Sequence, residues 1–61
     1  MTVTRAAADL APGDQARFPS GWERVTRVTR TLGQLFVEAH DQDGETVRHN
    51  LTPSERFEVI Q

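Results

Sequence analysis

One tryptophan and four arginines lie close together in the first half of this sequence, and their chemistry suits binding of nucleic acid. An indole offers a flat stacking surface for bases, and guanidinium groups make two-pronged contacts with phosphate. The five residues are Arg17, Trp22, Arg24, Arg27 and Arg30. Glu23 is the one acid among them, so the segment from Arg17 to Arg30 carries a net charge of +3. Nucleic-acid binding through this segment is therefore one of two functions we consider.

The chain as a whole is mildly acidic, which argues against this function. Its net charge is −2 and its pI is about 5.5. Residues 31–61 hold six acids against two arginines, a net charge of −4. This asymmetry indicates either a binding face or two solvated strands whose charges complement each other within one small fold. We favour the second interpretation, because non-specific affinity for nucleic acid depends mainly on neutralising phosphates.

Metal binding and catalysis are not expected from the remaining polar residues. His40 and His49 fall on opposite faces of the hairpin predicted below, so they are poorly placed to share an ion. The run from Asp41 to Glu45 is too short for a calcium loop and is typical of a turn. The sequence has no cysteine, no glycine-rich phosphate loop and no Ser/His/Asp set. We expect no enzyme activity, no cofactor and no metal, with His49 as a partly buried side chain.

These side chains are positioned by a β-hairpin predicted over residues 35–51. Two alternating runs flank the loop Gln42-Asp43-Gly44, which places glycine where φ must be positive. A loop of this length fixes the pairing: Leu35 with Leu51, Phe36 with Asn50, Val37 with His49, Glu38 with Arg48, and Ala39 with Val47. One face is then almost wholly apolar, as a half-buried strand pair requires.

Phe36 is the exception on the polar face of this hairpin. An exposed phenylalanine in a central strand is a candidate contact for a protein partner or a second copy of the chain. The alternative is that the N-terminal segment, with Leu10, folds over it. Trp22, which follows the turn at residues 19–21, is the other candidate contact.

The elements before the hairpin are two further strands. Residues 15–18 follow a Pro-Gly turn and place Ala16 and Phe18 inward. Residues 22–30 are rich in β-branched residues, but Val25 and Val28 are three positions apart, which a regular strand cannot place on one face. We therefore expect a β-bulge near Thr26. Residues 1–9 show no strand alternation, and we expect a flexible segment with one or two helical turns.

The end of the chain contains a short capping box before a last strand. Thr52-Pro53-Ser54-Glu55 has Thr as N-cap, Pro at the first helical position and Glu at the third. The last strand follows directly, so the box predicts no more than a single turn of 3-10 or α-helix. The strand then places Phe57 and Val59 on one face.

Four motifs together resemble the Src-homology-3-like small barrel of KOW, Tudor and chromo-type domains. They are Leu10-x-Pro12-Gly13-Asp14, Val25-x-x-Val28, Asp43-Gly44 and Thr52-Pro53-Ser54-Glu55. The resemblance spans most of residues 10–60 and implies an all-β, five-stranded barrel with a one-turn 3-10 helix before the last strand. It also implies a module that binds nucleic acid, methylated side chains, Pro-rich peptides or other proteins. With one Trp and no Tyr, a cage or groove of several aromatics is not expected.

The sequence therefore predicts one small β-barrel domain over residues 10–61 that binds a macromolecule without catalysing a reaction. The leading prediction is protein–protein interaction or self-association through Phe36 or Trp22, and the alternative is nucleic-acid binding through Trp22 and the segment from Arg17 to Arg30. No run of residues is apolar enough for a membrane span or a signal peptide, so we expect a cytoplasmic protein with no membrane partner and no small-molecule substrate. Such a chain suits a bacterial or bacteriophage protein of unassigned role.

Overall fold

The computed structural model describes residues 1–60 and shows an all-β protein with one antiparallel sheet of six strands. The strands lie in the order β1-β6-β2-β3-β4-β5, and a short 3-10 helix, η1, follows the first of them. The elements are β1 (Thr2–Ala6), η1 (Ala7–Asp9), β2 (Gln15–Phe18), β3 (Gly21–Thr31), β4 (Gln34–His40), β5 (Thr46–Leu51) and β6 (Arg56–Ile60).

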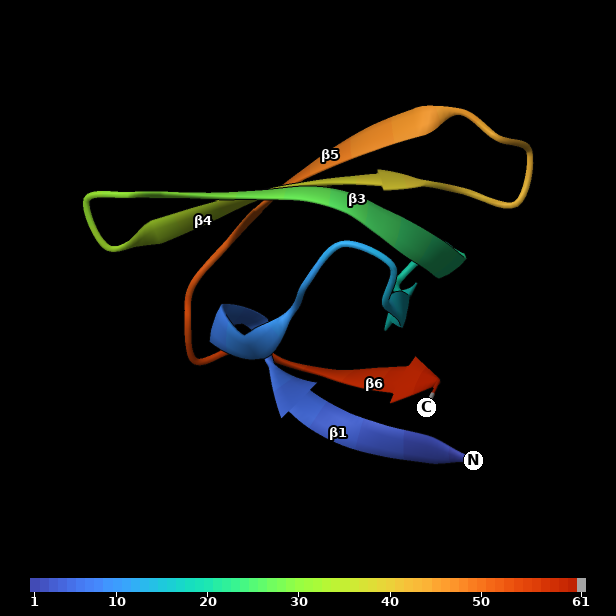
Figure 1. The fold of residues 1–61 in the computed structure, drawn as a ribbon, viewed down its shortest axis with the longest axis horizontal. Coiled ribbons are helices and arrows are strands. Elements are labelled where there is room, and N and C mark those ends of the chain that lie inside the picture. Colours follow the sequence, from blue (N-terminus) through green and yellow to red (C-terminus); the bar gives the residue numbers. More distant parts are fainter. Residues whose placement is uncertain (61) are drawn as a thin grey trace.

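The sheet folds over on itself through β2, which pairs with β3 on one side and with β6 on the other. Figure 1 shows β3, β4 and β5 together on one side of the molecule and β1 with β6 on the other. The sheet is open, with β1 and β5 at the two ends of the strand order. The prediction of an all-β fold is confirmed. Six strands replace the predicted five, and the described residues show no closed barrel.

The hairpin of β4 and β5 has the predicted register at all five predicted pairs, from Leu35 opposite Leu51 to Ala39 opposite Val47. Gly44 has φ 82°, as its place in the loop requires. The Asp41 carboxylate accepts hydrogen bonds from the backbone N–H groups of Asp43 and Glu45, both at 2.9 Å. The loop is thus held by ordinary Asx-turn chemistry.

The predicted β-bulge in β3 is present. The register between β3 and β4 shifts between Val25 and Arg27. Val25 is buried opposite Ala39, and Val28 lies opposite the buried Val37, so both valines reach the same face. The bulge also bends the long strand β3, which helps the sheet to fold over.

The N-terminal segment differs from the prediction. Residues 2–6, predicted to be flexible, form β1, which pairs with β6 from Thr2 opposite Ile60 to Ala6 opposite Arg56. The 3-10 helix η1 is then fixed to the chain before β6, because the N–H of Ala7 donates to the carbonyl of Glu55 at 2.6 Å. The local signal was weak, since five residues of Thr, Val, Arg and Ala form a strand only where a partner strand is available.

The 3-10 helix predicted before the last strand is absent from residues 52–55, which form a turn instead. Half of the capping box is present: the Glu55 carboxylate accepts a hydrogen bond from the Thr52 N–H at 3.3 Å, and the Glu55 N–H donates to the Thr52 carbonyl at 3.2 Å. With β6 starting at Arg56, no residues are left to continue a helix. The one 3-10 helix of the described chain is η1, near the N-terminus.

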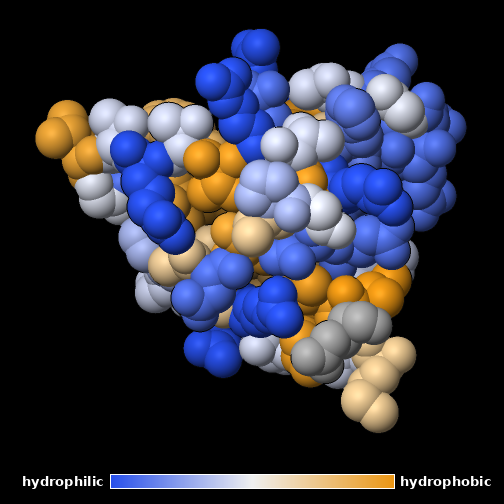
Figure 2. Space-filling model, in the orientation of Figure 1, coloured by the Kyte–Doolittle hydropathy of each residue, from blue (hydrophilic) through white to orange (hydrophobic). Residues whose placement is uncertain are grey.

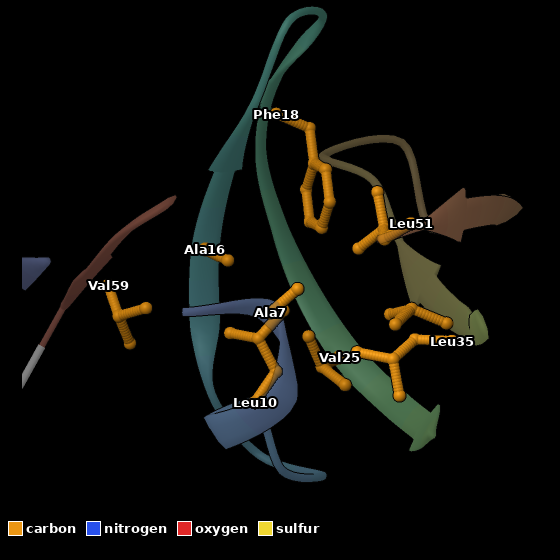
Figure 3. Close-up of a cluster of buried hydrophobic side chains, with 9 residues drawn as sticks. Ala7, Leu10, Ala16, Phe18, Val25, Leu35, Leu51 and Val59 are labelled. Carbon is orange, nitrogen blue, oxygen red and sulfur yellow. The ribbon is translucent and has the colours of Figure 1, made fainter. Parts of the chain in front are cut away.

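The core lies between the two halves of the folded sheet, with η1 closing one side. Figure 3 shows Val59 of β6 facing a cluster that includes Leu35 and Leu51 from the β4–β5 hairpin, with Leu10 and Ala7 of the η1 region between them. The buried apolar side chains are Ala7, Leu10, Ala16, Phe18, Val25, Leu35, Val37, Ala39, Leu51 and Val59. Each large one stabilises the fold by roughly 1.5–3 kcal/mol. Eight predicted inward positions are confirmed by this set: Ala16, Phe18, Val25 and Val59, together with Leu35, Val37, Ala39 and Leu51 on the apolar face of the hairpin.

Candidate functional site

The sheet face turned away from the core, which we call the outer face, carries most of the residues predicted to bind a ligand. Trp22 lies directly opposite Arg17 across β2 and β3. Trp22 is only partly buried and is not one of the side chains that form or pack against the hydrophobic core of the described residues. The indole therefore does not cover the hydrophobic core.

The four arginines of the basic segment do not converge on Trp22. Arg24 and Arg27 are exposed, with Arg24 opposite His40 and Arg27 opposite Glu38 on β4. Arg30 lies opposite the buried Leu35, on the inner side of the sheet, and its Nη2 donates a hydrogen bond to the carbonyl of Ala8. The structure thus separates Arg30 from the other three.

Acidic residues lie among the arginines that remain on the outer face. Arg17 forms an exposed ion pair with Glu58, with 3.6 Å between Nη1 and Oε1. Glu38 stands in one row between Arg27 and Arg48. Trp22 also lines a polar pocket of about 280 Å³ with Ser20, Glu23, Asp41, Gln42 and Asp43. The local charge around Trp22 is therefore mixed rather than basic, which agrees with the interpretation of mutually complementary strands.

Phe36 is exposed at 44% on the outer face of β4. Its cross-strand neighbours, Thr29 on β3 and Asn50 on β5, are uncharged and exposed. The alternative that the N-terminal segment covers Phe36 is wrong, because Leu10 is 3% exposed in the core and residues 2–6 pair with β6. Phe36 and Trp22 are separated by about six residues along the strands, or about 20 Å, so they do not form one site.

A second exposed apolar residue, Leu32, was missed in the sequence. It is the first residue of the two-residue loop between β3 and β4 and is 98% exposed. Gly33 has a positive φ, of 78°, and Leu32 also has a positive φ, of 49°. Two positive φ angles are typical of a type I′ turn, whose first position favours Asn, Asp or Gly. The exposure of Leu32 could have been predicted from the turn Thr31-Leu32-Gly33-Gln34, because a two-residue hairpin loop places both central residues in solvent.

The structure buries one carboxylate, that of Glu23, which is 2% exposed. Its Oε1 lies 2.7 Å from Nε2 of His49, and its Oε2 accepts a hydrogen bond from the Ser20 hydroxyl at 2.9 Å. The His49 ring is in turn stacked on Phe18, with centroids 4.0 Å apart and an interplanar angle of 5°. The sequence held a signal for this cluster, since Glu23 alternates in phase with the inward Val25 and His49 was placed on the inner face.

This cluster of Ser20, Glu23 and His49 is arranged for structure rather than for nucleophilic catalysis. The carboxylate stands between the hydroxyl and the imidazole, whereas a serine nucleophile needs the imidazole next to it as base. Here the Ser20 hydroxyl donates to the Glu23 carboxylate, which is also bonded to His49. The cluster links the β2–β3 turn and β3 to β5 across the inside of the fold.

Two further features of residues 1–60 bear on the site. No three His, Asp or Glu side chains are grouped there in a way that would hold a metal ion. No helix in that part of the chain is long and apolar enough to cross a membrane.

Comparisons of the chain with protein-family models, with curated proteins and with solved structures gave no match. The structure by itself defines a small all-β protein with one six-stranded antiparallel sheet.

Proposed function

We propose that this chain is a non-enzymatic binding module that acts through protein–protein contact, with Phe36 at the centre of the contact surface. The observation that carries the proposal is the 44% exposure of Phe36 in the middle of a strand whose opposite face is buried. The row Thr29, Phe36 and Asn50 crosses three strands without a charge. An aromatic side chain with uncharged neighbours across the strands and a charged row beside it, here Arg27, Glu38 and Arg48, is typical of an interface with an apolar centre and a polar rim.

We also propose that the folded-over sheet is a variant of the Src-homology-3-like small barrel. Two observations support this: the bulge that bends β3, and the pairing of β6 with β2, the last and first of the predicted strands. Strand β1 is then an addition to that plan. Under this proposal the protein is a binding module by architecture, and the ligand is decided by its surface residues.

The test compares the proteins retained by the immobilised chain, the variant Phe36→Glu and the control variant Thr2→Glu. Thr2 is an exposed strand residue opposite Ile60, at the other end of the strand order, so both variants add one negative charge. We expect a protein retained by the wild type and by Thr2→Glu but reduced at least tenfold by Phe36→Glu. Because the contact is apolar, retention should survive an increase in salt from about 0.05 M to about 0.5 M.

Two outcomes would contradict the proposal. One is a bound set that does not distinguish Phe36→Glu from the wild type. The other is a partner whose retention falls with salt, since this would indicate a charged interface elsewhere on the surface.

Nucleic-acid binding is the second candidate, favoured by one observation. Trp22 lies outside the core and is paired with Arg17 across β2 and β3, an arrangement suited to stacking beside a phosphate contact. Glu58 and the acidic pocket beside Trp22 act against it.

An amide chemical-shift titration with short single- and double-stranded oligonucleotides at low salt tests this candidate. Shifts confined to residues 17–30 and abolished by salt would place nucleic acid first. The absence of shifts would exclude this candidate and leave the Phe36 surface as the site.

A further inference from the structure

The turn between β3 and β4 combines exposure with backbone strain. Leu32 is 98% exposed and is the one residue other than glycine with a positive φ among residues 1–60. A leucine in this conformation costs roughly 1–2 kcal/mol that an Asn or Gly would largely avoid. The fold gains nothing from it in return, since the side chain has no burial in this chain. A strained, fully exposed apolar residue indicates a role outside the folded monomer.

A pocket lies beside this turn. Its volume is about 350 Å³, and it is lined by Ala8, Arg30, Thr31, Leu32, Gly33, Gln34, Leu35 and Pro53. Much of the lining comes from aliphatic side chains of η1, β4 and the turn before β6. Figure 2 shows hydrophobic surface at the tip of the molecule where Figure 1 places the β3–β4 turn. The projecting side chain and the pocket are therefore neighbours on one surface.

We propose that two copies of this chain associate with two-fold symmetry through this surface, each placing Leu32 in the pocket of the other. In a two-fold interface the same patch meets itself, so the patch must contain both the projection and its receptor. The surface around Leu32 contains both. This inference rests on the proposed function in that it names the chain itself as one partner, but it uses a different surface from Phe36.

Two charged residues, one in the pocket lining and one that follows a lining residue in the sequence, also suit a second copy. Arg30 lines the pocket, and its guanidinium is bonded to the neutral carbonyl of Ala8. Asp9, next to Ala8 in η1, is exposed, and neither Asp9 nor Arg30 forms an ion pair within residues 1–60. Two-fold pairing brings a guanidinium and a carboxylate from each copy into the same interface. A patch with one of each sign is complementary to itself.

The available area indicates a weak dimer. A stable interface buries about 800 Å² on each partner, which is about a fifth of the 4174 Å² that this chain exposes. One leucine, one pocket and two charges cover less than that. We therefore expect dissociation constants in the range from about 10 µM to about 1 mM.

The test is sedimentation equilibrium across that concentration range for the wild type, Leu32→Asn and Leu32→Met. Asn suits the positive φ, so Leu32→Asn keeps the fold while it removes the apolar projection. We expect a concentration-dependent dimer for the wild type, at least tenfold weaker association for Leu32→Asn, and association within threefold of the wild type for Leu32→Met. Amide chemical shifts outside the turn serve as the check that all three are folded.

A charge-reversal pair tests the two-fold geometry itself. Arg30→Glu and Asp9→Arg should each weaken association at least threefold. The double variant should recover most of the loss, because the two charges are exchanged in both copies.

The outcomes separate this inference from the Phe36 proposal. A wild type that stays monomeric, or Leu32→Asn that dimerises as well as the wild type, would overturn the Leu32 dimer. A dimer that is lost in Phe36→Glu and kept in Leu32→Asn would also overturn it and would assign self-association to the Phe36 surface. A different protein retained by monomeric wild type but not by Leu32→Asn would replace the second copy as the occupant.

Discussion

The two ends of β3 reverse the usual distribution of polar and apolar side chains. Near its start, Glu23 is a carboxylate with 2% exposure, and just past its end, Leu32 is an aliphatic side chain with 98% exposure. Burial of a charge and exposure of a leucine are both unfavourable in isolation. The same strand therefore allows a direct comparison between a buried carboxylate and an exposed leucine.

The difference lies in what surrounds the two residues. Glu23 has its partners within the chain, in Ser20 and His49, and no buried side-chain nitrogen or oxygen of residues 1–60 lacks a hydrogen bond. Leu32 has no such compensation and adopts a strained φ besides. The buried carboxylate is thus accounted for by contacts within the chain, whereas the exposed leucine is not, which is why we propose that Leu32 contacts a second molecule.

The largest effect is expected from Glu23→Ala. Removing the carboxylate leaves the His49 ring and the Ser20 hydroxyl without their partner and opens a cavity inside the fold, which together cost about 3–5 kcal/mol. For a chain of this size that loss is most of the stability. Urea unfolding followed by tryptophan fluorescence measures it. The matched control is Glu58→Ala, which breaks the exposed ion pair with Arg17 and should cost less than about 1 kcal/mol. Equal losses from the two variants would show that burial of Glu23 does not matter.

A smaller loss is expected from His49→Phe. This change keeps a flat ring to stack on Phe18 but removes the nitrogen that lies 2.7 Å from Glu23. We expect a loss of about 1–3 kcal/mol, the cost of a buried group deprived of one hydrogen-bond partner. Thermal and urea unfolding give the value, and the double variant with Glu23→Ala should lose less than the sum of the single losses. Additive losses would mean that the two side chains are not coupled.

The smallest effect, and one of opposite sign, is expected from Leu32→Asn. The monomer should become more stable by about 1 kcal/mol, because Asn adopts a positive φ more readily than Leu. The measurement is urea unfolding at a concentration low enough for the chain to be monomeric. Gln34→Asn, one residue beyond the loop, is the control and should give no gain. A loss of stability in Leu32→Asn would mean that the leucine contributes to the folded monomer.

The elements that the sequence predicted correctly are those set by neighbouring residues. The register of the β4–β5 hairpin follows from a three-residue loop and strict alternation, and both can be read over 17 residues. The bulge in β3 follows from the spacing of Val25 and Val28. The position of Phe36 on the outer face follows from the same alternation. Alternation did not decide whether the N-terminal segment covers Phe36.

The candidate site was predicted only in part. Placement of Arg17 and Arg24 on one face was within reach of alternation, but the position of Arg27 on that face and of Arg30 on the inner side both depend on the bulge. The acids that lie among these arginines come from β4, β6 and the β4–β5 loop, which are distant in sequence. Sequence separation therefore concealed the mixed charge of the outer face.

The sequence by itself determined the all-β class, the two-residue periodicity of the central strands and the turns that set their register, because these depend on interactions over a few residues. The tertiary structure decided the rest: that residues 2–6 are a strand, that the sheet folds over through β2, that Glu23 contacts His49 and that Leu32 stays exposed. Each of these depends on segments that are 20 or more residues apart or on the absence of a neighbour. Such features form only when the whole chain packs, because strand pairing and burial stabilise contacts between distant residues that local conformational propensity does not predict.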